Sequence, residues 1–181
     1  MIYKLKNCRN GKEARYFTSV EIWEENEKLH FRFIADKCKF YCPYEEYNGI
    51  HARGDACEIL IGADPQRKQY YEIEISANNQ VMIALMEYKG VEEATQNPIL
   101  KINFVEECFV ESSVERLENG YVAHLCFPKE KILSGDGEIY FNAYRLETDG
   151  GEKEKHLMAL NPTKRPKFHC PSSYVYLKDY V

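Results

Sequence analysis

Hydrophobic and polar residues alternate along most of this 181-residue chain with a period of two, not the 3.6 residues of a helix. From Tyr70 to Ser76 the sequence reads Tyr-Tyr-Glu-Ile-Glu-Ile-Ser, so both isoleucines share a face with Tyr71, while Glu72 and Glu74 share the other face. This period predicts a strand there. It predicts further strands at Arg15–Trp23, Leu29–Ala35, Cys57–Gly62, Gln80–Met86, Lys101–Val110, Ser113–Leu117, Tyr121–Phe127, Glu138–Leu146 and Tyr174–Lys178.

Turn residues separate several of these strands, as in Asn78-Asn79, Glu118-Asn119-Gly120 and Asp149-Gly150-Gly151. Many short strands with such turns are typical of a β-sandwich or barrel. Only Pro128–Leu133 predicts a helical turn, with proline at the first position. We therefore expect an all-β fold, an antiparallel β-sandwich of the two-sheet jelly-roll or immunoglobulin-like kind with few short helical turns. A single domain over residues 1–181 is expected, since neither a linker nor a repeat interrupts the pattern.

Two long stretches, Asp36–Asp55 and Asn161–Ser173, do not fit the strand pattern. The first contains Pro43 and the turn Asn48-Gly49, and the second contains three prolines. Long loops are unusual in a compact β domain and often carry binding residues. We expect any binding site to use these two loops.

Composition narrows the classes of function. The formal net charge of −5 argues against a nucleic-acid-binding protein, which usually presents a basic face. The longest apolar runs are a few residues, as in Ile59-Leu60-Ile61, so no membrane span is expected. The N-terminal residues lack the apolar run of a signal peptide, which predicts a cytoplasmic protein as written, or an extracellular one if a leader was removed. Nothing in the sequence indicates the oligomeric state.

Seven cysteines are spread along the chain. Their odd number and spacing do not suggest a disulfide framework, and Cys38 and Cys42 have no second pair at zinc spacing. Cys57 and Cys126 lie in apolar strand-like runs, which favours small buried hydrophobic residues in a reducing compartment.

Motifs for catalysis are weak. The chain has no GxSxG, P-loop, HExxH or GxGxxG sequence. Cys170 adjoins His169, but adjacent residues rarely point at each other and no orienting third residue can be named. His30 and His124 lie within predicted strands and are interpreted as ordinary strand residues. A pair of carboxylates of the glycosidase kind stays possible by composition alone.

Three segments carry unusual polar residues for a sandwich. In the first, Gly54–Ile61, a loop places Asp55 and Glu58 three residues apart at the start of an apolar strand. Asp55 can bond backbone N–H groups of the loop. Glu58 lies inside the strand, where an unpaired buried carboxylate would be costly, so it needs a cation, a cluster of donors or a ligand hydroxyl.

The second segment, Ile139–Leu146, has Asn142 on one face and Arg145 on the other, apolar face. An arginine on an apolar face requires a carboxylate partner, and Glu58 is the first candidate. We therefore expect Glu58 and Arg145 to approach within salt-bridge distance or to share one pocket.

The third segment, Lys167–Tyr174, combines an aromatic ring, an imidazole and hydroxyls in a loop stiffened by proline. Sugar hydroxyls bind planar polar groups such as Asn, Arg, Asp and Glu, and the C–H faces of a pyranose pack on aromatic rings. The aromatic surface would come from Tyr44, Tyr47, Phe168 and Tyr174, with Trp23 a weaker candidate.

The order of these segments resembles the family 9 carbohydrate-binding modules, which are β-sandwiches that bind sugars and often accompany glycoside hydrolases. The matching segments are Gly54–Ile61, Tyr70–Ile75, Gly120–Pro128, Phe141–Arg145, Asn161–Thr163, Phe168–Pro171 and Tyr174–Leu177. In this resemblance Glu58 matches a carboxylate that contacts the ligand. Family members clamp the sugar between two tryptophans, where this chain has His51 or Ala52 and Leu160. The resemblance therefore implies a different ligand, a clamp rebuilt from Tyr and His, or lost binding.

The hypothesis from the sequence is non-catalytic binding of a mono- or oligosaccharide, as an accessory to glycoside breakdown. Its expected polar floor is Asp55, Glu58, Asn142 and Arg145. Its expected rim is Tyr44, Tyr47, His51, Phe168, His169 and Tyr174. No cofactor is expected, although the resemblance implies that structural calcium is possible. The alternatives are a degenerate sandwich used for protein interaction, a hydrolase and, more remotely, a haem-binding sandwich with His169 or a Met as axial ligand.

Overall fold

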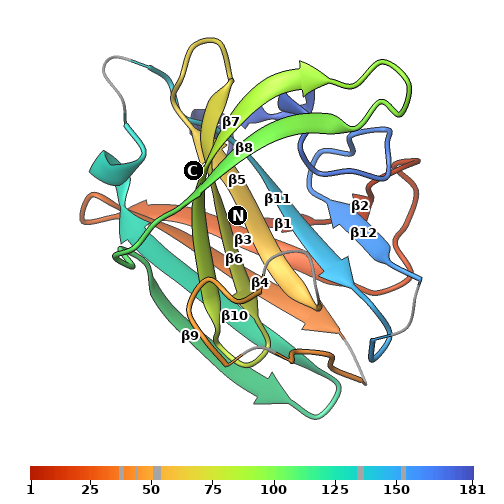
Figure 1. Ribbon diagram of the computed structural model, residues 1–181. Coiled ribbons are helices and arrows are strands. Elements are labelled where there is room, and N and C mark those ends of the chain that lie inside the picture. The colour runs from red at the N-terminus through yellow and green to blue at the C-terminus, as the bar shows by residue number, and fades with distance from the viewer. Residues whose placement is uncertain (37–38, 44, 51–53, 134–136, 152–153) are drawn as a thin grey trace.

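The computed structural model describes residues 1–36, 39–43, 45–50, 54–133, 137–151 and 154–181. Two antiparallel sheets pack face to face in these ranges (Figure 1). The five-stranded sheet runs in the order β1 (Ile2–Lys4), β3 (Thr18–Glu25), β4 (Lys28–Asp36), β10 (Gly120–Pro128) and β9 (Glu111–Leu117). The eight-stranded sheet runs β2 (Lys6–Asn7), β12 (His156–Ala159), β11 (Tyr140–Glu147), β5 (Ala56–Gly62), β6 (Gln69–Ser76), β7 (Val81–Val91) and β8 (Pro98–Phe104), with β13 (Val175–Tyr176) also paired to β11.

The two-sheet fold predicted from the sequence is confirmed. The expected helical turn is the 3-10 turn η1 (Lys129–Lys131), and two others, η2 (Pro171–Ser173) and η3 (Leu177–Asp179), lie near the C-terminus. The strand expected at Lys101–Val110 instead ends at Phe104, after which the chain leaves the sheet. The strands β1, β2 and β12 were not predicted, because at two to four residues they are too short to show an alternating pattern.

The main core fills the space between the sheets. In β4 buried and half-buried residues alternate along the strand, so Leu29, Phe31 and Phe33 face the core. Every residue of β5 and β11 is buried, although alternate side chains must point to opposite faces. The outer face of these central strands is therefore also covered.

A second apolar cluster lies on that outer face of the eight-stranded sheet. It includes Leu60, Tyr70, Tyr140 and Tyr144, and the half-buried Phe168 packs against it. The loop of residues 161–173 covers this cluster. A loop that packs on a sheet face creates buried positions for polar side chains outside the main core.

The six cysteines that the structure describes are free thiols, and Cys57 and Cys126 are buried as predicted, while Cys38 lies outside the described residues. Within the described ranges, no helix has the length and hydrophobicity needed to cross a membrane.

Candidate functional site

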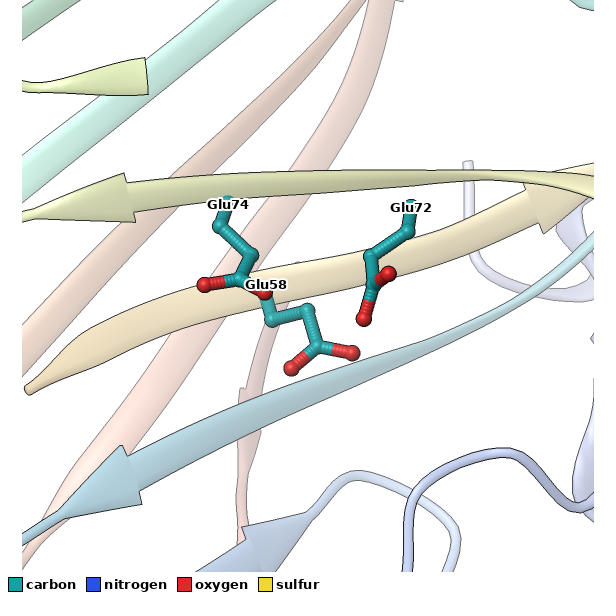
Figure 2. Close-up of side chains that lie close together, drawn as sticks. All are labelled: Glu58, Glu72 and Glu74. Carbon is teal, nitrogen blue, oxygen red and sulfur yellow. The ribbon is translucent and has the colours of Figure 1, made fainter. Parts of the chain in front are cut away.

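Three glutamates meet on the covered outer face of the eight-stranded sheet. Glu58 of β5 lies directly opposite Glu74 of β6, and Glu72 is two residues away on β6, on the same face. One carboxylate oxygen of each lies within 4.8 Å of the others. Figure 2 shows the three carboxylates gathered in one place over β5 and β6. We call Glu58, Glu72 and Glu74 the acid triad.

The acid triad is more than nine-tenths buried, with exposed fractions of 5% for Glu58 and 4% for Glu72 and Glu74. Among the described residues, Glu58 Oε1 and Glu72 Oε2 are buried without a hydrogen-bond partner. Burial, followed by the charges of Glu72 and Glu74, raises the pKa of Glu58 well above its ordinary value. Burial and the charge of Glu72 likewise raise the pKa of Glu74. Ionisation of these buried glutamates therefore lowers the stability of the folded protein.

An imidazole adjoins the acid triad. His169 Nε2 lies 3.3 Å from Glu72 Oε1, and its Nδ1 lies 3.1 Å from the hydroxyl of Tyr70. Both ring nitrogens therefore have polar neighbours. These two contacts hold the imidazole beside the carboxylates, with its side chain only 18% exposed.

Asn142 fixes the loop that carries His169. Its Nδ2 donates to the carbonyl of Asn161 at 2.8 Å, and its Oδ1 accepts from the Asn161 backbone N–H at 3.0 Å. The hydroxyl of Tyr144 donates to the Phe168 carbonyl at 3.0 Å, and the two rings stack at 4.4 Å. The buried β11 side chains thus place Phe168 and His169 next to the acid triad.

A pocket of about 510 Å³ opens over the acid triad. Its remaining wall includes Phe168, His169 and Leu157. The ammonium of Lys167, at the pocket edge, donates to the carbonyl of Gln96 at 2.9 Å and so ties the loop to the β7–β8 hairpin. We call this cavity the outer pocket. It combines carboxylate acceptors with apolar and aromatic surface.

The predicted contact between Glu58 and Arg145 is wrong. Glu58 is opposite Tyr144, and Arg145 is opposite Cys57, so the two side chains point to opposite faces of the sheet. Arg145 lies fully buried in the main core, where it donates to Glu147 Oε2 at 2.7 Å and to Thr18 Oγ1 at 2.8 Å. The arginine does have a carboxylate partner, but that partner is Glu147.

Two other residues of the expected floor are fully buried and bonded within the chain. Asp55 Oδ1 accepts from the backbone N–H and the hydroxyl of Thr148, at 2.8 and 2.7 Å. Its Oδ2 accepts from the Tyr41 backbone N–H at 2.7 Å. Asn142, described above, holds the loop. Neither residue lines the outer pocket.

The expected rim is divided between several places. Phe168 and His169 line the outer pocket. Tyr174 is buried beside it, with its ring against those of Tyr70 and Tyr140. Tyr47 packs against the main core, away from the pocket. Tyr44 and His51 lie outside the described residues.

Sequence reasoning missed the roles of Glu72 and Glu74. They were assigned to the polar face of their strand, but that face is covered. A signal was present, because each of these three glutamates interrupts an apolar strand, and Glu72 and Glu74 share one face of theirs. Only the pairing register shows that the three share one site.

The cysteine next to His169 does not form a nucleophile pair with it. Cys170 Sγ lies 3.4 Å from Ser172 Oγ, while both nitrogens of His169 face Tyr70 and Glu72. The acid triad also differs from a glycosidase pair, whose carboxyl groups face each other across the substrate at about 5–9 Å. Here the carboxylates share one floor and lie closer together.

Comparison with known proteins shows what this fold is similar to. No family model matches the sequence, and no curated protein matches it. A structure from Bacteroides uniformis, of a protein proposed to bind carbohydrate, aligns with a TM-score of 0.71 and 14% identity over 96% of this chain and 84% of that one.

A family 9 carbohydrate-binding module from Caldicellulosiruptor kristjanssonii in complex with glucose aligns with a TM-score of 0.62 and 9% identity, covering 96% of this chain and 82% of that one. A family 9 module from the same organism in complex with cellotriose has a TM-score of 0.53 and 10% identity, covering 87% and 71%. These likenesses confirm, at the level of the fold, the resemblance predicted from the sequence.

Proposed function

We propose that this protein binds a mono- or oligosaccharide in the outer pocket without transforming it. The observation that carries this proposal is the pocket itself, a cavity of about 510 Å³ in which buried carboxylates adjoin the ring of Phe168. Neighbours of the same fold that are described in complex with glucose and cellotriose support the choice of ligand class.

The chemistry of the pocket suits a polyhydroxylated ring. Carboxylate oxygens accept hydrogen bonds from hydroxyl groups, and Glu58 Oε1 and Glu72 Oε2 have that capacity unused among the described residues. The aromatic face of Phe168 offers a surface for the C–H groups of a sugar. Phe168 would thus provide one aromatic wall for the ligand, in place of a clamp of two tryptophans.

Two rival functions fit the site less well. A sandwich that had lost its ligand would have the site filled by its own side chains, whereas an open pocket is present. A glycosidase needs two carboxyl groups on either side of a bond, whereas the acid triad lies on one floor. An accessory role in glycoside breakdown, through a partner enzyme, is part of our proposal and rests on the family resemblance.

Isothermal titration calorimetry with glucose and cellotriose tests the proposal, at ligand concentrations reaching tens of millimolar because shallow sugar sites often bind weakly. We expect binding by the full chain, with affinity lowered about tenfold or more in Phe168→Ala, equivalent to about 1.4 kcal/mol. The matched control is Phe104→Ala, which removes an exposed ring of β8 that does not line the outer pocket.

A wider screen on a glycan array extends the test to other sugars. Equal loss of binding in Phe168→Ala and Phe104→Ala would place the ligand elsewhere. A folded wild-type chain that binds none of the arrayed or titrated sugars would overturn the proposal.

A further inference from the structure

The acid triad has an unusual charge balance for a buried site. Three carboxylates from two adjacent strands converge, and Glu58 and Glu74 are directly opposite each other, where like charges repel. Their nearest imidazole, His169, contacts Glu72, and Lys155 and Lys167 line the same pocket. Isolated buried carboxylates are retained when a proton, a cation or a metal ion compensates them.

The unused oxygens show where the compensating group would lie. Glu58 Oε1 and Glu72 Oε2 are buried, lack a hydrogen-bond partner among the described residues, and belong to side chains that line the outer pocket. Both carboxylates are more than nine-tenths buried. A polar atom in that position is normally satisfied, so each unused oxygen indicates a missing partner.

We propose that the acid triad binds a hard divalent cation of the calcium type at the floor of the outer pocket. One oxygen of each glutamate lies within 4.8 Å of the others, as required for ligands of one ion (Figure 2). A charge of +2 would offset most of the negative charge of three carboxylates. The ion would use the same unpartnered oxygens that the proposed function offers to sugar hydroxyls, so the two sites overlap, but binding of the ion requires no sugar.

The donor set selects the class of metal. All three ligands are carboxylates, which suit calcium and magnesium better than zinc or copper. Both nitrogens of His169 already have polar neighbours, so the imidazole is not a free donor. Calcium ligands lie at about 2.3–2.6 Å, so two on opposite sides of the ion are about 4.6–5.2 Å apart.

Magnesium suits this donor set less well. It requires nearly ideal octahedral geometry with ligands at about 2.0–2.1 Å, and it retains its water shell more strongly. Calcium also accepts irregular coordination by six to eight oxygens. Second carboxylate oxygens and water in the outer pocket would complete its shell.

Calorimetry with calcium chloride alone tests the proposal on the full chain, after treatment with EDTA and its removal at pH 7.5. We expect one calcium ion per chain and a rise in the unfolding temperature with calcium. Glu58→Gln and Glu72→Gln should each weaken binding at least tenfold. Magnesium should bind more weakly than calcium.

The matched control is Glu87→Gln on β7 of the same sheet, whose carboxylate is held by Lys89 and Lys101 at 2.6 and 2.9 Å. It should bind calcium as the wild type does. Terbium luminescence excited through tyrosine provides a local readout, because Tyr144 is opposite Glu58 in the sheet. Should Glu58→Gln fail to fold, competition of calcium against bound terbium in the wild type still decides the matter.

Absence of calcium heat and of any shift in unfolding temperature at 10 mM calcium would overturn the proposal, as would wild-type binding by both triad variants. Protons alone would then neutralise the charge of the acid triad. Sugar titrations are read separately, so calcium binding without sugar binding leaves this inference intact and contradicts only the proposed function.

Discussion

The eight-stranded sheet buries acidic side chains on both of its faces, and the two sites are satisfied in opposite ways. On the inner face, Glu147 is fully buried and accepts from Arg145 at 2.7 Å. On the outer face, the acid triad is almost as deeply buried, yet Glu58 Oε1 and Glu72 Oε2 lack partners among the described residues.

This difference distinguishes a structural site from a binding site. The Arg145 guanidinium also donates to Thr18 Oγ1 and to the Asp36 carbonyl at 2.9 Å, so the inner pair joins the two sheets. Both terminal nitrogens of Arg145 thus bond within the chain, and only its Nε lacks a hydrogen-bond partner among the described residues. The acid triad instead lines a pocket, where a ligand can bond to the carboxylate oxygens that lack a partner among the described residues.

The largest expected effect is on the inner pair. Arg145→Leu leaves Glu147 buried without its arginine, which should lower the free energy of unfolding by about 3–5 kcal/mol. Urea denaturation followed by circular dichroism measures this loss. The double variant R145L/E147L should recover much of it, because no charge is then left uncompensated. A loss below about 1 kcal/mol in Arg145→Leu would contradict the distinction between the two faces.

The opposite sign is expected for the acid triad. In EDTA, Glu58→Gln should raise the free energy of unfolding at pH 8 by roughly 1–2 kcal/mol, because it removes a buried like charge. The folded state raises the pKa of Glu58 and Glu74, so it holds their protons more tightly than the unfolded state does. Their contribution is therefore full below the ordinary pKa of 4.5 and is lost as pH rises through the folded value.

Unfolding curves between pH 4.5 and 8 check this dependence. Glu58→Gln should flatten the loss at higher pH, and the control Glu87→Gln should not. The prediction is contradicted if the wild type in EDTA becomes more stable from pH 4.5 to pH 8 and Glu58→Gln is less stable than the wild type at pH 8. The acid triad would then not destabilise the fold.

The smallest effect is expected on the outer face of the five-stranded sheet, which is half-exposed. There His30 Nδ1 lies 3.2 Å from His124 Nε2, and Trp23 stacks on both rings. Burial, followed by the charges of His30 and Arg32, lowers the pKa of His124. The contribution of His124 to stability is therefore full above the ordinary pKa of 6.5 and is lost as pH falls toward and through the lower folded value.

His124→Asn should reduce this loss at acidic pH. Unfolding temperatures at pH 5.5 and 7.5 measure it, with Glu87→Gln as the comparison that should leave the difference between the two pH values unchanged, because the lysines beside Glu87 lower its pKa to about 2. An equal loss in His124→Asn and wild type would show that this imidazole does not drive the acid response. Together His124→Asn and Glu58→Gln separate the pH behaviour of the two outer faces.

Much of the architecture follows from the sequence alone. Alternation with period two predicted ten strands and the two-sheet class, and it placed Asn142 and Arg145 on opposite faces of one strand. It also showed that Arg145 needs a carboxylate and that Glu58 needs a partner. These properties depend on near neighbours in the chain, which is why a local pattern reveals them.

Only the tertiary structure decided which partners meet. The register sets Glu58 opposite Tyr144 and Arg145 opposite Cys57, and a shift of one residue would reverse their faces. The register likewise brings Glu74 and Glu72 to Glu58, and the loop anchored by Asn142 covers them. Strand pairing and the packing of a distant loop are long-range contacts. They depend on the free energy of the whole fold, not on the residues adjacent in sequence.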